Sequence, residues 1–544
     1  MQINKITILG GGSAGWMTAA ALVTKFPDME ISLIESSDIP TIGVGESTLG
    51  AFHSYLNLLD TSEEEWMPYC NSTYKLSVDF TNWDGEGTRF HYPFGNYQPF
   101  IKKIAPIDDK HVWFLKQGLD NSKGTEYARL LFDTIELIQN NKFTKNEEGF
   151  LQNFDCLSLE KDYAYQFDAK LFGQWLKQYY CKPRGVNHII GTYVDCEQHE
   201  NGNIKCLQLE GHKEKYYADL FVDCSGFRGL LIDKVLNVEF CSFDDILIND
   251  CALATTIPYT DKNTEMETTT NATTMNAGWC WNIPLYNRIG TGYVYSSQFL
   301  TEDEAETEFR EYLLKHRLPF ANKEPQVNFN KIKFKTGVRT TPFYKNVVSI
   351  GLSSGFIEPL ESTGLMLTHN AITHLVNLLQ LADNGKKPIG FLKSSFNKWI
   401  HNNMDIASFI ALHYSWASRS DTPYWEYITN DMEWPPDYIE RGSIKNNIYD
   451  GINNIKKYSH VGTSIGKMFS KFGVVEGLSI VMAGMGRKML TEDAIIDLCG
   501  DEIHDDLAKI NSWIQTRHER NKRYVNTLPT HYEYLKENIY NGEE

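Results

Sequence analysis

The stretch from residue 3 to residue 35 restricts the fold of this chain more than any other part of it. Residues 3–9 have the apolar composition of a buried strand, and they lead into Gly-Gly-Gly-Ser-Ala-Gly at residues 10–15. An alanine-rich stretch of helical composition follows at residues 16–26. Glycines at the first, third and sixth positions of such a loop allow a tight turn, close approach of the backbone to a pyrophosphate, and close helix–strand packing. The N-terminus of the helix offers unpaired N–H groups to phosphate oxygens. We therefore predict an α/β fold with a dinucleotide site at Gly10, Gly12, Ser13, Ala14 and Gly15.

The second strand of this unit indicates which dinucleotides fit. Residues 31–34 (Ile-Ser-Leu-Ile) read as a strand that ends at Glu35. A carboxylate about 20 residues past the fingerprint accepts hydrogen bonds from ribose hydroxyls. Because a carboxylate disfavours a 2′-phosphate, we expect FAD or NAD rather than NADP, and this rule does not choose between the two.

Later segments favour FAD. Residues 220–228 and 346–355 are each a strand that ends in a turn of small residues, and residues 43–47 form a further glycine-rich loop. Several strands that end in glycine-containing turns, spread over hundreds of residues, fit a site for one extended FAD molecule better than a compact NAD-binding fold. The loop at 43–47, which includes Val44 and Gly45, is expected to run beside the isoalloxazine ring.

Charge and cysteine usage exclude several classes of partner. The 544 residues carry a net charge of -18, and no basic block suggests a nucleic-acid groove. The 10 cysteines are scattered singly with no metal-ligand spacing, so we expect no metal site, free thiols and a reducing compartment. No apolar run is long enough to cross a bilayer, and the first strand leaves no room for a signal peptide. We expect a cytoplasmic protein that binds neither nucleic acid nor membrane.

Two short motifs point to the chemistry. Residues 278–284 (Gly-Trp-Cys-Trp-Asn-Ile-Pro) place Trp279 and Trp281 one residue apart, and Lys75 is the lone charge in the run 70–78. With residues 355–364 (Gly-Phe-Ile-Glu-Pro-Leu-Glu-Ser-Thr-Gly) and 419–425 (Arg-Ser-Asp-Thr-Pro-Tyr-Trp), these motifs resemble the flavin-dependent halogenases of the tryptophan-halogenase type. The resemblance covers nearly the whole chain, from the glycine loop to Thr-Leu-Pro-Thr-His-Tyr at 527–532.

The resemblance implies a reaction and two catalytic residues. A separate flavin reductase would supply reduced FAD, and its reaction with dioxygen would oxidise a halide ion, the co-substrate, to hypohalous acid. The acid would cross an internal passage to an electron-rich aromatic substrate. Lys75 would hydrogen-bond the hypohalous acid or form a haloamine. Glu361 would tune Lys75 or take the proton lost from the arenium ion. In an arbitrary protein, Lys75 would be read as a surface lysine and Glu361 as an ordinary carboxylate at a helix start.

The resemblance also assigns residues that contact the ligands. Thr363 and Gly364 would bind halide where a turn enters a helix, and Ser362 would order their neighbourhood. Trp279 and Trp281 would be walls of the passage, although packing alone suggests core aromatics. The remaining FAD contacts implied by the resemblance are Val44, Gly45, Val194, Gly351 and Leu365.

The substrate pocket matches the family less well. Phe94 fits an aromatic substrate wall, and Tyr92 stands where the family usually has histidine. Between about 440 and 480 the chain lacks the clustered tyrosines, glutamate and tryptophan that hold the amino-acid head group in enzymes acting on free tryptophan. Because a buried polar clamp supplies most discrimination for such groups, we expect a small indole or phenol-like substrate rather than strictly free tryptophan.

The expected fold is the Rossmann-like FAD-binding fold of flavin monooxygenases and halogenases, with an interleaved substrate sheet and a mainly helical C-terminal region. We place an FAD-binding lobe at 1–390, substrate-facing segments at roughly 85–150 and 240–330, and a helical cap at 391–544. Self-association into a homo-oligomer stays open. Two alternatives remain, an aromatic hydroxylase, which Lys75 and the tryptophan pair disfavour, and a non-catalytic FAD-binding protein.

Overall fold

The structure is a computed structural model in which the chain alternates between two compact units. It describes residues 3–37, 45–95, 126–145, 162–316, 327–383, 388–404, 406–433, 484–486 and 503–542. Unit 1 comprises Met1–Thr73, Tyr165–Asp250 and Ile332–Ala407, and unit 2 comprises Tyr74–Ala164, Cys251–Lys331 and Ser408–Glu544. The division predicted at residue 390, with substrate-facing segments at 85–150 and 240–330, stays a prediction.

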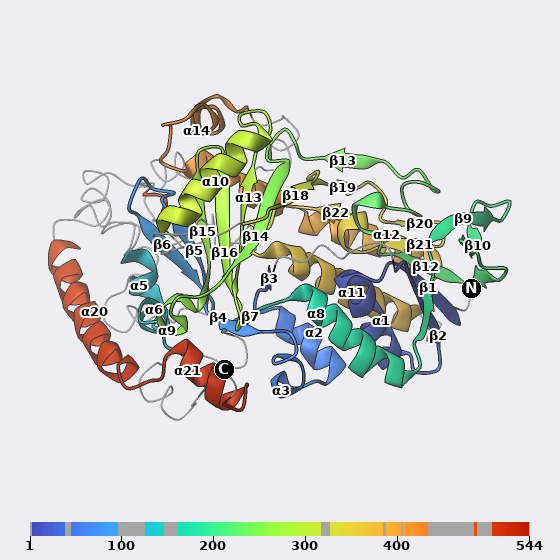
Figure 1. The fold of residues 1–544 in the computed structure, drawn as a ribbon, viewed down its shortest axis with the longest axis horizontal. Coiled ribbons are helices and arrows are strands. Elements are labelled where there is room, and N and C mark those ends of the chain that lie inside the picture. Colours follow the sequence, from blue (N-terminus) through green and yellow to red (C-terminus); the bar gives the residue numbers. More distant parts are fainter. Residues whose placement is uncertain are drawn as a thin grey trace. The chain divides into compact units, whose positions relative to one another are not determined.

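Unit 1 is built on a six-stranded sheet of Rossmann type. Its strand order is β20-β21-β12-β1-β2-β8, and neighbouring strands from β21 to β8 are parallel (Figure 1). The strands are β1 (Lys5–Leu9), β2 (Glu30–Glu35), β8 (Asn187–Ile190), β12 (Leu220–Asp223), β20 (Phe343–Tyr344) and β21 (Val347–Ser349). The predicted α/β fold is confirmed, because the apolar runs read as strands occupy the centre of this sheet.

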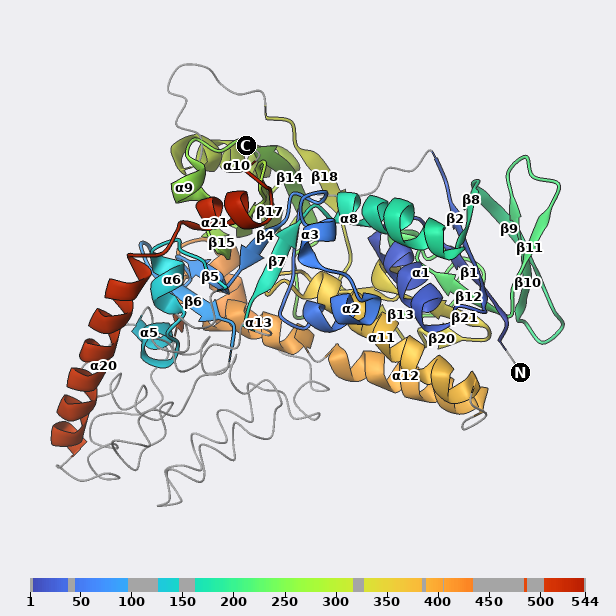
Figure 2. The same cartoon turned by 90° about the horizontal axis from the view of Figure 1, so that it is seen from below.

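Helices pack against this sheet, and smaller sheets flank it. Helix α1 (Ser13–Lys25) is almost entirely buried because its small residues allow close packing on α11 (Thr363–Asp383) and α8 (Ala169–Trp175). Figure 2 shows β9–β11 as a separate twisted ribbon beyond β8. Other elements of unit 1 are α2 (Phe52–Leu59), α3 (Glu63–Trp66), η3 (Leu176–Cys181), η4 (Lys182–Arg184), η5 (Gly226–Arg228), η6 (Gly351–Ser353), α12 (Ile389–Asn403), β3 (Glu46–Ser47), β9 (Tyr193–Gln198), β10 (Ile204–Leu209), β11 (Lys215–Tyr217), β13 (Phe240–Ser242), β19 (Gly337–Arg339) and β22 (Gly355–Phe356).

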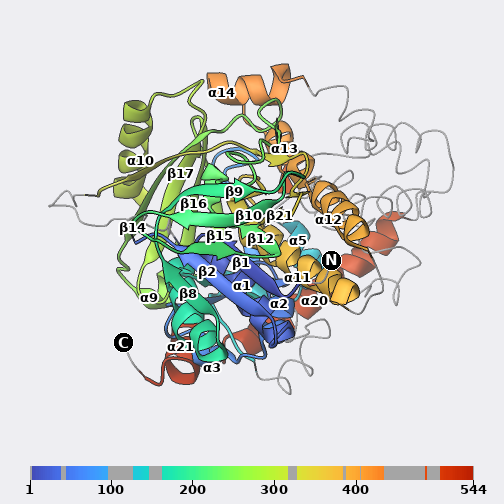
Figure 3. The same cartoon turned by 90° about the vertical axis from the view of Figure 1, so that its right-hand side faces the viewer.

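Unit 2 is built on a seven-stranded sheet with the order β18-β14-β17-β16-β15-β5-β6. The pairings are antiparallel along β14-β17-β16-β15, while β15 and β5 are parallel. Helix α10 (Glu302–His316) covers the sheet beside β17, where Phe309 and Leu313 join an apolar cluster (Figure 3). The strands are β5 (Ser77–Thr81), β6 (Arg89–Pro93), β14 (Cys251–Ile257), β15 (Thr269–Met275), β16 (Gly278–Pro284), β17 (Ile289–Tyr295) and β18 (Asn330–Lys333). Strand β4 (Thr73–Lys75) precedes β5, and it pairs with β7 (Ala164–Phe167) in a separate three-stranded sheet with β3.

The described remainder of unit 2 is largely helical, as predicted for the C-terminal region. None of the described helices is long and apolar enough to cross a membrane. The helices are α5 (Tyr127–Leu131), α6 (Ile135–Gln139), α9 (Lys262–Glu265), α13 (Ile406–Trp416), α14 (Pro423–Glu426), η7 (Tyr427–Asp431), α20 (Ile503–Val525) and α21 (His531–Asn538).

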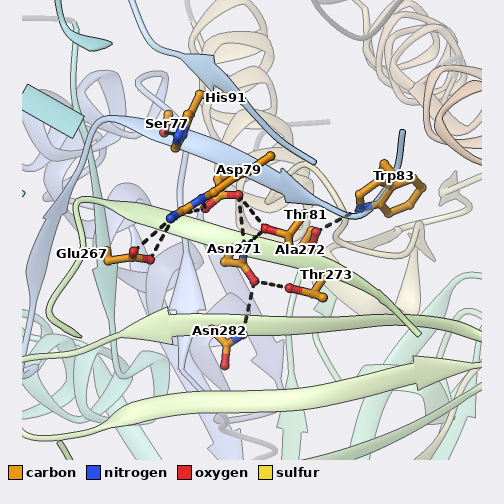
Figure 4. A network of polar contacts seen from close by, with 11 residues as sticks. Ser77, Asp79, Thr81, Trp83, His91, Glu267, Asn271, Ala272, Thr273 and Asn282 are labelled. Atoms are coloured by element: carbon orange, nitrogen blue, oxygen red, sulfur yellow. Dashed lines mark hydrogen bonds and ion pairs between the residues drawn. The ribbon is translucent and has the colours of Figure 1, made fainter. Parts of the chain in front are cut away.

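A row of polar side chains crosses one face of the seven-stranded sheet (Figure 4). The strand register places Asp79 beside Asn271 and Asn271 beside Asn282. Asn271 Nδ2 donates to Asp79 Oδ1 at 3.0 Å, and Arg89 Nε donates to Asp79 Oδ2 at 2.8 Å. Side chains alternate between faces along a strand, so Trp281 and Phe80, which flank Ala272 in the register, lie on the opposite, aromatic face.

Replacing Asp79 with alanine is expected to lower the free energy of unfolding by about 2 kcal/mol, because the hydrogen bonds from Asn271 and Arg89 to a fully buried carboxylate are lost. Burial alone would raise the pKa of Asp79, but the Arg89 guanidinium holds it below its ordinary value. A carboxyl whose pKa falls on folding stabilises the protein above its unfolded-state pKa, and this contribution is lost as the pH falls through the folded-state pKa.

The measurement is the thermal unfolding midpoint of the two variants Asp79→Ala and Glu267→Ala. Glu267 also accepts from Arg89, but its side chain is 28% exposed, so its loss should cost less than about 1 kcal/mol. If the two variants lowered the unfolding midpoint equally, Asp79 and its polar row would not contribute more to stability than the partly exposed Glu267.

Candidate functional site

The glycine loop of unit 1 has the shape that a dinucleotide requires. Gly10 has φ 123°, and a Cβ there would lie 2.2 Å from the carbonyl oxygen of Cys224. A Cβ on Gly15 would lie 1.9 Å from the carbonyl oxygen of Gly10, so the strand and helix approach as closely as predicted. A Cβ on Gly12 would meet no atom within 4 Å. Ser13 begins α1 and donates from Oγ to the carbonyl oxygen of Ala169 at 3.0 Å. The backbone at Gly12 therefore borders space that the protein does not fill, and the loop fits a pyrophosphate.

Glu35 ends β2 beside this loop, where a ribose-binding carboxylate was expected. A Cβ on Gly11 would lie 1.7 Å from Glu35 Oε2. Lys177 Nζ and His188 Nε2 donate to Glu35 Oε1 at 2.5 and 2.8 Å. Burial and the neighbouring Lys177 lower the pKa of His188. A carboxylate has about four lone-pair sites, so Glu35 keeps capacity for ribose hydroxyls while Lys177 and His188 fix its orientation. Sequence reasoning missed both residues, since nothing in their local sequence marks them.

Other predicted FAD contacts are distributed unevenly over unit 1. Gly351, with φ 75°, lies against Ala14, because a Cβ on it would be 2.9 Å from the Ala14 Cβ. Gly45 has φ 88° and precedes β3. The Val194 side chain is 54% exposed on β9, outside the six-stranded sheet, and its predicted contact stays a prediction. Val44 lies outside the described residues.

Glu46, next to Gly45, is a titratable group that the sequence did not single out. Burial and the carboxylate of Asp168 raise the pKa of Glu46 to about 7. Asp168 caps α8, whose first residue, Ala169, accepts the Ser13 bond. A carboxylic acid whose pKa is raised towards neutrality therefore belongs to the segment that follows Gly45.

The N-terminus of α11 forms a donor-rich turn. Ser362 has φ 60°, in the left-handed region, and its N–H donates to the carbonyl oxygen of Pro359 at 2.9 Å. Thr363 is fully buried, and within the described chain its Oγ1 has no hydrogen-bond partner. A Cβ on Gly364 would meet no atom within 4 Å. A helix N-terminus and an unsatisfied hydroxyl beside open space favour a small anion. Glu361 and Leu365, both buried, flank this turn.

Lys75 ends β4 in unit 2 and is not a surface lysine. Its side chain is fully buried, and Nζ lies 5.1 Å from the centroid of the Phe94 ring. The face of an aromatic ring stabilises an ammonium group. The N–H of Phe94 donates to the carbonyl oxygen of Leu76 at 2.8 Å, which anchors the ring beside the lysine. Tyr92, on β6, pairs in register with Val78. The predicted Lys75 and Phe94 are therefore brought together.

Trp279 and Trp281 lie on β16 in the same unit. Both are buried, and their ring centroids are 6.3 Å apart. Gly292 on β17 makes room for Trp281, because a Cβ there would lie 2.1 Å from the indole ring. Among the described residues, nothing accepts a hydrogen bond from Trp281 Nε1. Trp281 therefore combines core packing with an N–H donor for which the described part of the chain offers no acceptor.

Comparison with known proteins identifies the family of this chain. The family model described as tryptophan halogenase matches residues 5–493. The 7-chloro-L-tryptophan 6-halogenase KtzR of Kutzneria sp. (strain 744) is 33% identical over 551 residues, which cover 97% of this chain and 98% of KtzR.

Two solved structures are similar over nearly their full length. The apo structure of VirX1 has a TM-score of 0.87 and 36% identity, and the match covers 99% of this chain and 100% of that one. The tryptophan 6-halogenase SttH of Streptomyces toxytricini has a TM-score of 0.80 and 32% identity, with 98% and 99% covered. By sequence, fold and the residues described above, the chain belongs to the tryptophan halogenase family and is a flavin-dependent halogenase.

Proposed function

We propose that this enzyme oxidises a halide to hypohalous acid and uses Lys75 to direct the halogen onto an electron-rich aromatic ring. The observation that carries the proposal is the full burial of Lys75 beside Phe94, in a run with no other charge. Keeping an ammonium group out of water is costly unless its surroundings stabilise it. At Lys75 the Phe94 ring contributes to this stabilisation, and burial keeps the amine out of bulk water, in a place where it could act on a bound oxidant.

FAD is proposed to bind to unit 1 through Gly10, Gly12, Ser13, Gly15 and Glu35. When bound and reduced, FAD supplies the electrons with which dioxygen is activated to oxidise the halide. A separate flavin reductase is proposed to deliver the reduced cofactor. The chain's own contribution here is to hold the pyrophosphate on the N–H groups of α1 and to fix Glu35 through Lys177 and His188.

The halide is proposed to bind at Thr363 and Gly364. The buried Thr363 hydroxyl and the N–H groups of the first turn of α11 would donate to the anion. The left-handed conformation of Ser362 supports this assignment, because strained backbone is retained where the surrounding structure needs it.

At Lys75, the proposed step is an electrophilic substitution. The ammonium group donates a hydrogen bond to the hypohalous acid, or the amine carries the halogen as a haloamine. In the first route, a carbon–halogen bond forms as the halogen–oxygen bond breaks, and the Lys75 ammonium group gives its proton to the departing oxygen, so that water leaves. Glu361 is proposed to receive the ring proton. Holding oxidant and ring in fixed positions replaces a free encounter by an oriented one.

The tryptophan pair is proposed to line the path of the oxidant and to keep the organic substrate from the flavin. The unused N–H of Trp281 supports this role, since it could donate to a passing polar molecule. The comparisons do not favour the aromatic hydroxylase considered above.

The substrate is proposed to be a small indole or phenol-like aromatic. KtzR and SttH are named for tryptophan, which supports an indole ring. The segment at about 440–480, whose composition argues against strict tryptophan selectivity, lies outside the described residues.

A panel of tryptophan, indole and phenol tests this assignment. Each compound is supplied with bromide, dioxygen, FAD and a flavin reductase, and products are identified by mass spectrometry. We expect the small aromatics to be brominated at least as fast as tryptophan. Turnover of free tryptophan far above that of simple indoles would contradict the proposed substrate class.

A further inference from the structure

The C-terminal motif at 527–532 has no place in the proposed reaction, yet one of its residues reaches the strand that bears Lys75. His531 is the first residue of α21, follows the N-cap Thr530 and is fully buried. Its ring contacts two backbone groups in other parts of unit 2, one at Tyr74 and one at Met266.

The two contacts define the state of the ring. The N–H of Tyr74 donates to His531 Nε2 at 3.1 Å, so Nε2 is an acceptor. The Met266 carbonyl only accepts, so His531 Nδ1 donates to it at 3.0 Å. Burial lowers the pKa of His531 to about 4. The imidazole is therefore neutral at pH 7, with its proton on Nδ1.

The ring bridges two backbone groups that belong to different elements. Tyr74 lies on β4, which pairs with β7, and Met266 is the C-cap of α9. The imidazole accepts from the Tyr74 N–H and donates to the Met266 carbonyl. It therefore satisfies both groups, at the residue before Lys75.

The backbone is fixed on both sides of Lys75. After it, the N–H of Leu76 donates to the Thr268 carbonyl at 2.7 Å. Before it, Tyr74 is held by His531, and its ring stacks on Phe143 with centroids 4.3 Å apart. We propose that His531 is a positioning residue for Lys75, acting through the hydrogen bond that it accepts from the Tyr74 N–H. This inference rests on the proposed function of Lys75.

Other contacts hold the C-terminal segment independently of the imidazole. Lys142 Nζ donates to the Leu528 carbonyl at 2.7 Å, and Thr530 Oγ1 donates to Asn263 Oδ1 at 2.8 Å. The N–H of His531 donates to the Asn141 carbonyl at 3.0 Å. Substitutions of the ring should therefore leave the segment docked.

A matched pair of variants separates the two bonds of the ring. His531→Gln places an amide oxygen near the position of Nε2 and keeps an acceptor for Tyr74. His531→Asn places an amide nitrogen near the position of Nδ1 and keeps only the donor for Met266. Lys142→Met is the control, because it removes a contact of the segment without touching Tyr74.

Two quantities are measured for each variant, namely hydrogen exchange of the Tyr74 amide and halogenated product formed per flavin reoxidised. We expect His531→Asn to lose amide protection and to form about tenfold less product, since small misplacements near the chemistry have effects of this size or larger. His531→Gln should keep the protection and stay within about threefold of the wild type. Lys142→Met should keep the protection of the Tyr74 amide and the wild-type yield of product.

Equal losses in the Asn and Gln variants, or wild-type product in His531→Asn, would overturn the proposal. Rapid exchange of the Tyr74 amide in the wild type would also overturn it, whether or not the variants fold. The exchange measurement does not depend on catalysis. If halogenation did not need Lys75, the proposed function of Lys75 would be wrong, but the exchange measurement would still show whether His531 holds the Tyr74 N–H.

Discussion

Replacing Lys75 with methionine is expected to lower the rate of halogenation by about 10³-fold, the size of effect seen when a positioned donor is removed from its reaction. Methionine is unbranched and only one atom shorter than lysine, so most of the space beside Phe94 stays filled. Product formation and flavin reoxidation are measured in the same reaction. Reoxidation should continue at the wild-type rate, because Lys75 is not one of the proposed FAD contacts.

Lys75→Arg distinguishes the two proposed roles of the amine. Arginine keeps the charge and donates hydrogen bonds, but it does not replace lysine as a nucleophile. Partial activity in Lys75→Arg would indicate hydrogen bonding to the hypohalous acid, and none would indicate a haloamine. Wild-type halogenation by Lys75→Met would contradict both roles.

Replacing Glu361 with glutamine is expected to lower halogenation by about 10²-fold, because an amide does not accept the ring proton. Glutamine has nearly the same shape, so the buried turn before α11 should be preserved. Loss of the proton then becomes the slow step. The measurement compares the rates on an ordinary and a ring-deuterated substrate.

The wild type should show little isotope effect and Glu361→Gln a clear one. A slower variant with no isotope effect would indicate that Glu361 acts before the proton is lost. Thermal unfolding of the same samples provides the control for an altered turn.

Local patterns predicted the nucleotide end of the fold well. The strand, glycine loop, helix and second strand at 3–35 are contiguous, and each depends on neighbours a few residues away. Gly10 and Gly15 have the tight contacts that their positions in the loop imply. The predicted helix after Glu361 and the strands around residues 220 and 347 are confirmed for the same reason.

Contacts between distant segments were beyond the reach of sequence patterns. Glu35 was predicted as a ribose ligand, but its partners Lys177 and His188 lie 142 and 153 residues further along the chain. His531 and Tyr74 are separated by 457 residues. The His531 side chain accepts a hydrogen bond from the backbone N–H of Tyr74. Every residue except proline has such an N–H, so the sequence does not indicate which residue is the partner. Val194 shows a related difficulty, since strand composition does not reveal which sheet a strand joins.

The burial of Lys75 is an intermediate case. The composition around Lys75 does not show whether this isolated lysine is exposed or buried. In the structure its side chain is buried. The polar row of Asp79, Asn271 and Asn282 also needs the fold, because only the register of β5, β15 and β16 aligns these side chains.

The most direct test of the central claim is product analysis of the wild-type enzyme with an indole, FAD, a flavin reductase and dioxygen, in the presence and absence of bromide. We expect a brominated indole that forms only with bromide, and no hydroxylated product when bromide is absent. A hydroxylated indole without bromide, or no product under either condition, would contradict it.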